Sequence, residues 1–278
     1  MTEFYLILAA LLAFTLNHSS RVLRVAGTLL AAAALAMIAW SIYLATQDGT
    51  FDAIPAGAAG LAPYKPLILT MQAGIAAGAT VFLLWAAWRQ ALRPVPTPLP
   101  WRNTTELFGL MSRHLHWFIG VLMLVMLPMG VFTTLLPASH PARDAFLATR
   151  QTLGLLILLL VLLRLIWLRQ SPAPPPPPAS PREKLTARVT HLALYALLLG
   201  FPLLGLLITA WRGDPVEVFG WTLTGMLALH DDAAAAAGVL HNVVLPAIFY
   251  LAIALHLGAV LKHQTSPAGR GMVRRMLR

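Results

Sequence analysis

The sequence predicts an all-α membrane protein with about seven transmembrane helices, because it combines an apolar composition, long uncharged segments and an uneven charge distribution. Of its 278 residues, 58% are hydrophobic and 11% are charged, against roughly a quarter charged in a typical soluble domain. A helix needs about 20 mostly apolar residues to cross a bilayer. The chain offers seven such segments, at residues 4–20, 25–46, 66–88, 108–136, 147–168, 190–211 and 237–261.

Two of these segments include or border polar residues. The first segment is short and ends at Asn17, which also fits a cleaved signal peptide. It starts with Glu3 instead of a basic residue, and no small-residue cleavage pattern precedes Arg21, so we expect a retained helix. The fifth segment contains Arg164. We expect its head group to snorkel to the polar flank that follows.

The net charge of +10 comes from basic residues that are distributed asymmetrically along the predicted helices. With the N-terminus outside, the inside segments contain 16 of the 20 Lys and Arg residues, and eight of the ten acidic residues lie outside. This is the positive-inside pattern, and it explains the basicity without a nucleic-acid partner. It predicts a protein that crosses the lipid membrane several times and has a cytoplasmic C-terminus. The four outside basic residues are Lys65, Arg143, Arg150 and Arg212.

The residue types that are missing exclude several kinds of chemistry. There is no cysteine, which rules out disulfides, thiolate metal sites, iron–sulfur clusters and covalent haem attachment through cysteine. The sequence has no Gly-rich phosphate loop, nucleophile elbow or zinc-protease helix pattern. Any redox chemistry must therefore use other ligands.

Two proline-rich stretches, residues 94–100 and 172–181, organise the chain. Both fall in predicted cytoplasmic loops, where polyproline II geometry makes a semi-rigid spacer; partner recognition is the alternative for the second. The first stretch separates residues 1–100, a three-helix region of unknown role, from residues 101–278, a four-helix domain. Gly74 and Gly78 give the three-helix region a small-residue face suited to close packing, so we expect it to dock on the four-helix domain.

Histidines inside the predicted helices carry most of the functional information, because an unpartnered polar ring in lipid costs a few kcal/mol. His116 lies three residues after Arg113 at the cytoplasmic start of the fourth segment, and His256 lies six residues before Lys262 at the cytoplasmic end of the seventh. Both rings should lie roughly 5–9 Å below the membrane boundary. Two imidazoles at equal depth on antiparallel helices can hold one haem iron from opposite faces. Two histidines that hydrogen-bond between helices are the alternative.

A third histidine, His241, precedes His256 by fifteen residues on the seventh segment. In an ideal helix this separation is about 22 Å along the axis and about 60° around it, so one helix can contribute ligands to two stacked cofactors. Pro246 lies between the two histidines and removes a backbone donor. We therefore expect a local bulge or kink that changes their phase.

Two further histidines, His191 and His263, lie at the predicted cytoplasmic interface, outside the apolar core. This position suits hydrogen-bond donors to a quinone carbonyl, with solvated or headgroup-binding histidines as the equal alternative. His114 is two residues from His116 and faces roughly the opposite side of its helix, so we interpret it as non-ligating.

Several short motifs occur together and in order in the four-helix domain. They are Arg113-His114-Leu115-His116-Trp117, Arg164-Leu165, His191-Leu192-Ala193-Leu194-Tyr195 with Pro202 and Gly205, Arg212-Gly213-Asp214-Pro215, and Leu255-His256 with His263. In these motifs the chain resembles the bacterial cytochrome b561 family over residues 106–278, roughly 62% of its length. That family comprises four-helix, di-haem, quinone-linked cytochromes of the bacterial inner membrane. It includes the superoxide oxidase that passes electrons from superoxide to ubiquinone.

The resemblance implies roles for individual residues. It makes His116 and His256 the iron ligands of a cytoplasmic b-type haem, and His241 one ligand of a periplasmic haem. His191 and His263 match histidines associated with the family's quinone site, where ubiquinone or another quinone would be the substrate.

One position departs from the family pattern. The second periplasmic ligand is normally a histidine at the start of the domain's second helix, and Arg150 occupies that place here. Arginine stays protonated and is not a usual haem ligand. The periplasmic site is therefore absent, five-coordinate through His241, or completed by a loop histidine, with His140 preferred over His230. One haem b and two are both compatible with the sequence.

The sequence thus predicts a membrane b-type cytochrome, a quinone-linked oxidoreductase that transfers electrons between a periplasmic donor and the quinone pool. The resemblance makes superoxide one candidate donor, and a periplasmic redox protein is another. Arg150 and Arg212 could attract a small anion from outside, so superoxide would approach there. The alternative interpretation of both arginines is that they bind lipid headgroups or cap loops. The competing hypothesis for the whole chain is a haem-free transporter or assembly factor whose intramembrane histidines carry protons or metal ions.

Overall fold

The computed structural model describes residues 20–47, 49, 63, 65–91, 100–135, 137, 139, 143–176, 179–224, 229–265 and 275–276. Its long helices are α2 Arg21–Gln47, α3 Lys65–Ala91, α4 Leu110–Leu135, α5 Arg143–Gln170, α6 Pro181–Trp211, and a continuous stretch made of α7 Asp231–Val239, η2 Leu240–Val244 and α8 Leu245–Thr265. The predicted all-α membrane fold is confirmed. The predicted helix at 4–20 lies outside the described residues apart from Ser20.

Four helical segments in the described part of the chain are long and apolar enough to cross a membrane. They are Lys65–Trp85, Arg143–Gln170, Pro181–Trp211 and Asp231–His263. Helices α2 and α4, with 27 and 26 residues, cover two more of the predicted segments. Six of the seven predicted segments therefore coincide with a long helix.

Helices α4, α5, α6 and α8 pack around one apolar core. Leu122 of α4 and Leu153 and Val161 of α5 have no exposed surface, and Phe249 of α8 is 2% exposed. Because lipid is as apolar as these side chains, close van der Waals packing drives their association more than exclusion from water does. This core separates the two ends of the bundle. We call them the basic end, where α4 and α6 begin and α5 and α8 end, and the hairpin end opposite.

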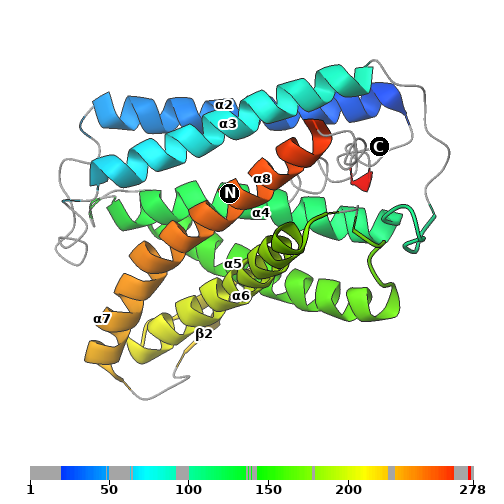
Figure 1. The fold of residues 1–278 in the computed structure, drawn as a ribbon. Coiled ribbons are helices and arrows are strands. Elements are labelled where there is room, and N and C mark those ends of the chain that lie inside the picture. The colour runs from blue at the N-terminus through cyan, green and yellow to red at the C-terminus, as the bar shows by residue number, and fades with distance from the viewer. Residues whose placement is uncertain are drawn as a thin grey trace.

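Helices α2 and α3 run side by side along one flank of the four-helix part (Figure 1). Ala32 of α2 and Leu83 of α3 belong to a buried apolar cluster that packs against Val121 and Leu124 of α4. The expected docking on the four-helix domain is thus present. Gly74 and Gly78 do not contribute to this docking, because a Cβ built at either position would meet no described atom of another helix within 4 Å. The expectation that their face makes a close helix contact is wrong for the described residues.

A buried amide ties α3 to the four-helix part. Gln72 Nε2 donates to the Leu127 carbonyl of α4 at 3.1 Å and to the Tyr250 hydroxyl of α8 at 2.6 Å. Gln72 and Tyr250 are 4% and 5% exposed. Hydrogen bonds of this kind between membrane helices contribute about 0.6–2 kcal/mol. One side chain therefore orients three helices.

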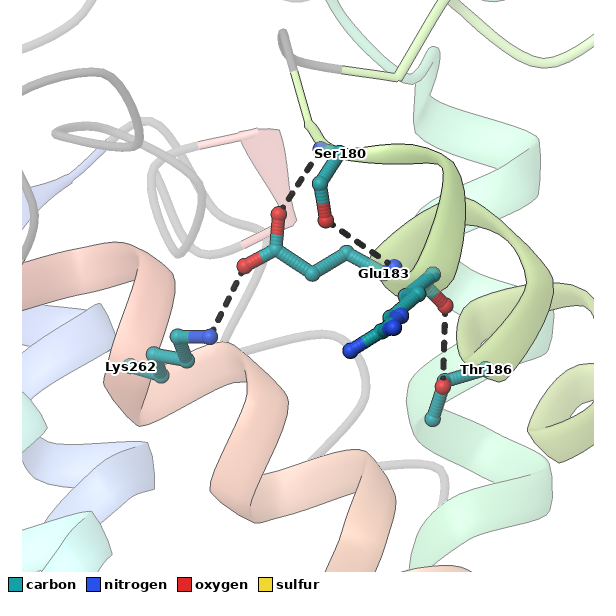
Figure 2. Close-up of polar contacts among 5 residues, drawn as sticks. Ser180, Glu183, Thr186 and Lys262 are labelled. Atoms are coloured by element: carbon teal, nitrogen blue, oxygen red, sulfur yellow. Dashed lines mark hydrogen bonds and ion pairs between the residues drawn. The ribbon is translucent and has the colours of Figure 1, made fainter.

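At the basic end, a network of hydrogen bonds joins the start of α6 to α8. Ser180 caps the helix by accepting from the Glu183 backbone N–H, Glu183 accepts in return from the Ser180 backbone N–H, and Pro181 occupies the first turn. The same Glu183 carboxylate accepts from Lys262 Nζ of α8 at 2.8 Å (Figure 2). This network begins α6 nine residues before the predicted apolar segment at 190, because a capped polar turn extends the helix out of the lipid.

The hairpin end carries a two-stranded sheet that the sequence analysis did not predict. Strands β1 Val216–Val218 and β2 Trp221–Leu223 pair in antiparallel fashion. Phe219 and Gly220 connect them with positive φ angles of 49° and 83°, as the favoured two-residue hairpin turns require. The sequence feature that could have predicted this hairpin is the run of β-branched and aromatic residues on both sides of Phe219 and Gly220.

The hairpin is fastened to α5. Gln151 Oε1 accepts from the Glu217 backbone N–H at 2.9 Å, and Thr152 Oγ1 donates to the Glu217 carbonyl at 3.1 Å. Both α5 residues directly follow Arg150, so the hairpin holds the helix turn on which that arginine lies.

The bulge expected from Pro246 is present. Residues Leu240–Val244 form a π-helical turn that ends two residues before Pro246. Because Pro246 has no backbone N–H, the Asn242 carbonyl loses its α-helical donor, and the turn widens. His241 lies in this turn and is 8% exposed, so the ideal-helix phase between His241 and His256 does not apply.

Changing Gln72 to Met should destabilise the protein by about 1–2 kcal/mol, because it leaves the buried Tyr250 hydroxyl without its donor. Thermal unfolding in detergent measures the effect. The control is Thr70→Leu, an exposed polar-to-apolar change two residues away on the same helix. Adding Tyr250→Phe to Gln72→Met should recover part of the loss. Equal melting temperatures for Gln72→Met and Thr70→Leu would contradict this role.

Candidate functional site

His116 of α4 and His256 of α8 face each other near the basic end. Their ring centroids are 6.3 Å apart, with an angle of 57° between the ring planes. An imidazole nitrogen binds a transition metal at about 2.0–2.1 Å, and its ring centroid lies about 1.1 Å further back, so two rings on opposite sides of one metal have centroids about 6.2 Å apart. The centroid spacing is therefore compatible with two imidazoles that would hold one haem iron between them.

A third imidazole and an indole complete the aromatic surroundings of the pair. The His191 ring of α6 lies 5.4 Å from the His256 ring at an angle of 76°, and the Trp117 ring lies 5.3 Å from the His116 ring. His191 is exposed on the bundle surface whereas His116 and His256 are half-buried. His191 thus connects the histidine pair to the lipid side of the bundle.

Arg164 of α5 points into this cluster. Its Nε donates to the Tyr195 hydroxyl at 2.8 Å, and its Nη1 donates to the Ser112 carbonyl at 3.3 Å. Its charge acts on His116, His191 and His256. The Ser112 carbonyl lies next to Arg113 at the predicted cytoplasmic start of α4, so the snorkelling expected of Arg164 stays a prediction. The position of Arg164 beside the histidines was not predicted from the sequence, although a charge inside an apolar segment is itself a functional signal.

The other two histidines of this end lie on α8 and α4. His263 is half-buried and lies two helical turns beyond His256, near the end of α8. His114 Nδ1 lies 2.9 Å from the Leu110 carbonyl of its own helix. That contact engages the ring locally, in keeping with its interpretation as non-ligating.

His241 occupies the bundle interior toward the hairpin end. Its ring packs edge-on against Phe201, with centroids 5.5 Å apart. A Cβ built on Gly205 would lie 3.4 Å from His241 Cε1, so the absence of a side chain at Gly205 makes room for the ring. His241 Nδ1 is buried and has no hydrogen-bond partner among the described residues.

Arg150, in the position that the family resemblance assigns to a ligand, also points inward. It donates to Thr133 Oγ1 of α4 and to Asn242 Oδ1 of η2, both at 3.3 Å, and its charge acts on His241. Arg212, by contrast, is exposed at the end of α6, with Nη2 3.8 Å from a Cβ built on Gly238. The two arginines thus lie at different depths.

The two loop histidines do not reach His241 in the described structure. His230 is exposed at the start of α7, on the same helical stretch as His241. His140 lies outside the described residues. The imidazole pair of the basic end therefore has no counterpart among the described residues of the hairpin end.

Comparisons with known proteins identify the family of this chain. The family model described as prokaryotic cytochrome b561 matches residues 107–278, which include every described helix from α4 onward. The chain is 31% identical over 163 residues to cytochrome b561 homolog 2 of Escherichia coli (strain K12), a match covering 58% of this chain and 86% of that protein. Helices α2 and α3 precede the family match. The chain therefore belongs to the prokaryotic cytochrome b561 family, which supports a membrane b-type cytochrome in electron transfer.

Proposed function

We propose that the chain is a quinone-linked cytochrome that holds haem b between His116 and His256 and passes electrons between a periplasmic donor and the quinone pool. The observation that carries the proposal is the 6.3 Å spacing of two imidazoles on antiparallel helices. When bound, haem supplies reversible one-electron chemistry. The protein contributes axial ligands, charge and access, which are the levers that set a haem's reduction potential.

Arg164 is the charge that we assign to this tuning. Tyr195 and Ser112 hold its guanidinium beside the three histidines. A fixed positive charge in a low-dielectric interior stabilises the state that carries one more electron. Arg164 should therefore raise the reduction potential of a haem held by His116 and His256.

His191 is the residue that we assign to quinone binding, with His263 as a second donor nearer the end of α8. His191 combines exposure to the lipid side with ring contact to His256. A quinone headgroup arriving through the lipid could accept a hydrogen bond from its imidazole while lying close to the histidine pair. Ubiquinone is the candidate substrate, and other membrane quinones share the same two carbonyls.

The donor side is assigned to the hairpin end. Arg212 places a positive charge on the surface there, close to Gly238. Asn242 connects Gly238 to Arg150, because its Nδ2 donates to the Gly238 carbonyl and its Oδ1 accepts from Arg150. Two cations at increasing depth would attract a small anion. With superoxide as donor, two superoxide anions, one quinone and two protons give two dioxygen molecules and one quinol.

The rival function, a haem-free transporter or assembly factor, would use the same histidines for protons or metal ions. In the described part of the chain, no three His, Asp or Glu side chains converge on a position for a metal ion, whereas the spacing of His116 and His256 suits two axial ligands. A reduced-minus-oxidised spectrum without a b-type α-band would reject our proposal in favour of this rival.

Changing His256 or His116 to Ala should abolish haem binding near the basic end, because one imidazole cannot complete axial ligation there. The pyridine haemochrome of purified protein measures haem content. His114→Ala is the matched control and should retain haem, since that ring bonds to its own helix. Wild-type haem content in both the His116 and the His256 variants would contradict the ligand assignment.

Changing His191 to Leu should spare haem content but slow haem reduction by a ubiquinol analogue about 10-fold, the cost of one lost hydrogen bond in the transition state. Stopped-flow absorbance at the α-band measures the rate. His230→Leu, an exposed histidine at the opposite end, is the control. Loss of the haem spectrum in His191→Leu would mean that this residue holds the cofactor instead.

Changing Arg164 to Gln should lower the haem midpoint potential by on the order of 50–100 mV, because a half-buried positive charge beside the histidines is removed. A potentiometric titration followed at the α-band provides the value. Arg169→Gln removes an exposed charge from the last turn of the same helix and should shift the potential much less. An unchanged potential in Arg164→Gln with haem retained would rule out the tuning role.

A further inference from the structure

The two ends of the bundle differ in what their interior histidines face. Near the basic end, the His256 ring has the His116 ring at 6.3 Å. Toward the hairpin end, His241 is 8% exposed and packs against the Phe201 ring. Among the described residues no second imidazole lies across from it, and the charged group that acts on it is the Arg150 guanidinium.

Arg150 is built into the bundle by acceptors that are themselves oriented. Thr133 donates its hydroxyl hydrogen to the Met129 carbonyl at 2.8 Å, which leaves its oxygen lone pairs for Arg150. Asn242 donates its amide to the Gly238 carbonyl at 3.0 Å, which directs Oδ1 toward Arg150. The hairpin bonds to Gln151 and Thr152 hold the adjoining helix turn. The guanidinium is therefore a fixed part of the interior.

This arrangement does not fit a second haem held by two histidines. A guanidinium carries five N–H donors and no lone pair, so it cannot ligate iron. It stays protonated, and its positive charge beside His241 opposes a further metal cation there. His230 cannot lie opposite His241 across a macrocycle, because it precedes the first turn of the same continuous helical stretch that carries His241.

We infer that this chain carries a single haem, near the basic end, and that the cluster of Arg150, Thr133, Asn242 and His241 takes the place of the second. The inference rests on the proposed function, because it assumes that His116 and His256 hold haem. An electron donor outside the membrane then finds no cofactor near the outer surface. A small anion that can approach Arg150 is favoured over a redox protein that must stay at the surface.

Haem stoichiometry of the purified full-length chain tests the inference. The pyridine haemochrome and quantitative amino-acid analysis should give one haem per chain for the wild type. Changing Arg150 to His restores an imidazole at the position facing His241 and should raise the ratio to two, with a second midpoint potential in the redox titration. Arg150→Gln is the matched control, because it removes the charge without adding a ligand, and should stay at one.

Each alternative result is decisive. Two haems in the wild type would overturn the inference, and a fall to one in His140→Ala would then identify the missing ligand. One haem in both the wild type and Arg150→His would overturn the claim that Arg150 replaces the second haem. His241→Ala should leave the wild-type ratio at one, and in the Arg150→His background it should remove the second haem. A wild type without haem would instead reject the proposed function.

Discussion

Polar side chains in the interior of this bundle depend on partners inside the protein, because the surrounding lipid offers none. Arg164, Arg150 and Gln72 each obey this constraint, and each is bonded to a side chain and a carbonyl, or to two side chains, from neighbouring helices. Few orientations of the helices allow all of these hydrogen bonds to form. The polar groups therefore set how the apolar helices are rotated and where the functional side chains lie.

The same constraint gives the two ends of the bundle different chemistry. Near the basic end, Tyr195 and Ser112 hold a cation beside two facing imidazoles, which is an arrangement suited to ligating a redox centre and adjusting its potential. Toward the hairpin end, an arginine occupies the interior and an imidazole nitrogen is left without a protein partner. A single residue type at position 150 separates these outcomes, since histidine offers a lone pair and arginine offers only donors.

The helices outside the family match are joined to those inside it. Gln72 bonds to both α4 and α8, and the α2–α3 pair packs on α4 through small and branched apolar residues. Tyr250, the partner of Gln72, lies six residues before His256 on α8. The N-terminal helices therefore support the helix that carries His256.

The sequence by itself determined the membrane class, six of the described helices, the break before Pro246 and the candidate histidines, because hydropathy, charge asymmetry and proline chemistry act over short stretches of chain. It did not reveal the hairpin or the contact of Arg164 with Tyr195 beside the histidines. Those features depend on which side chains meet across helices that are far apart in the chain. Tertiary structure alone decided them, since a guanidinium can bond to Tyr195, Ser112, Thr133 or Asn242 only once helix packing has brought these residues within reach.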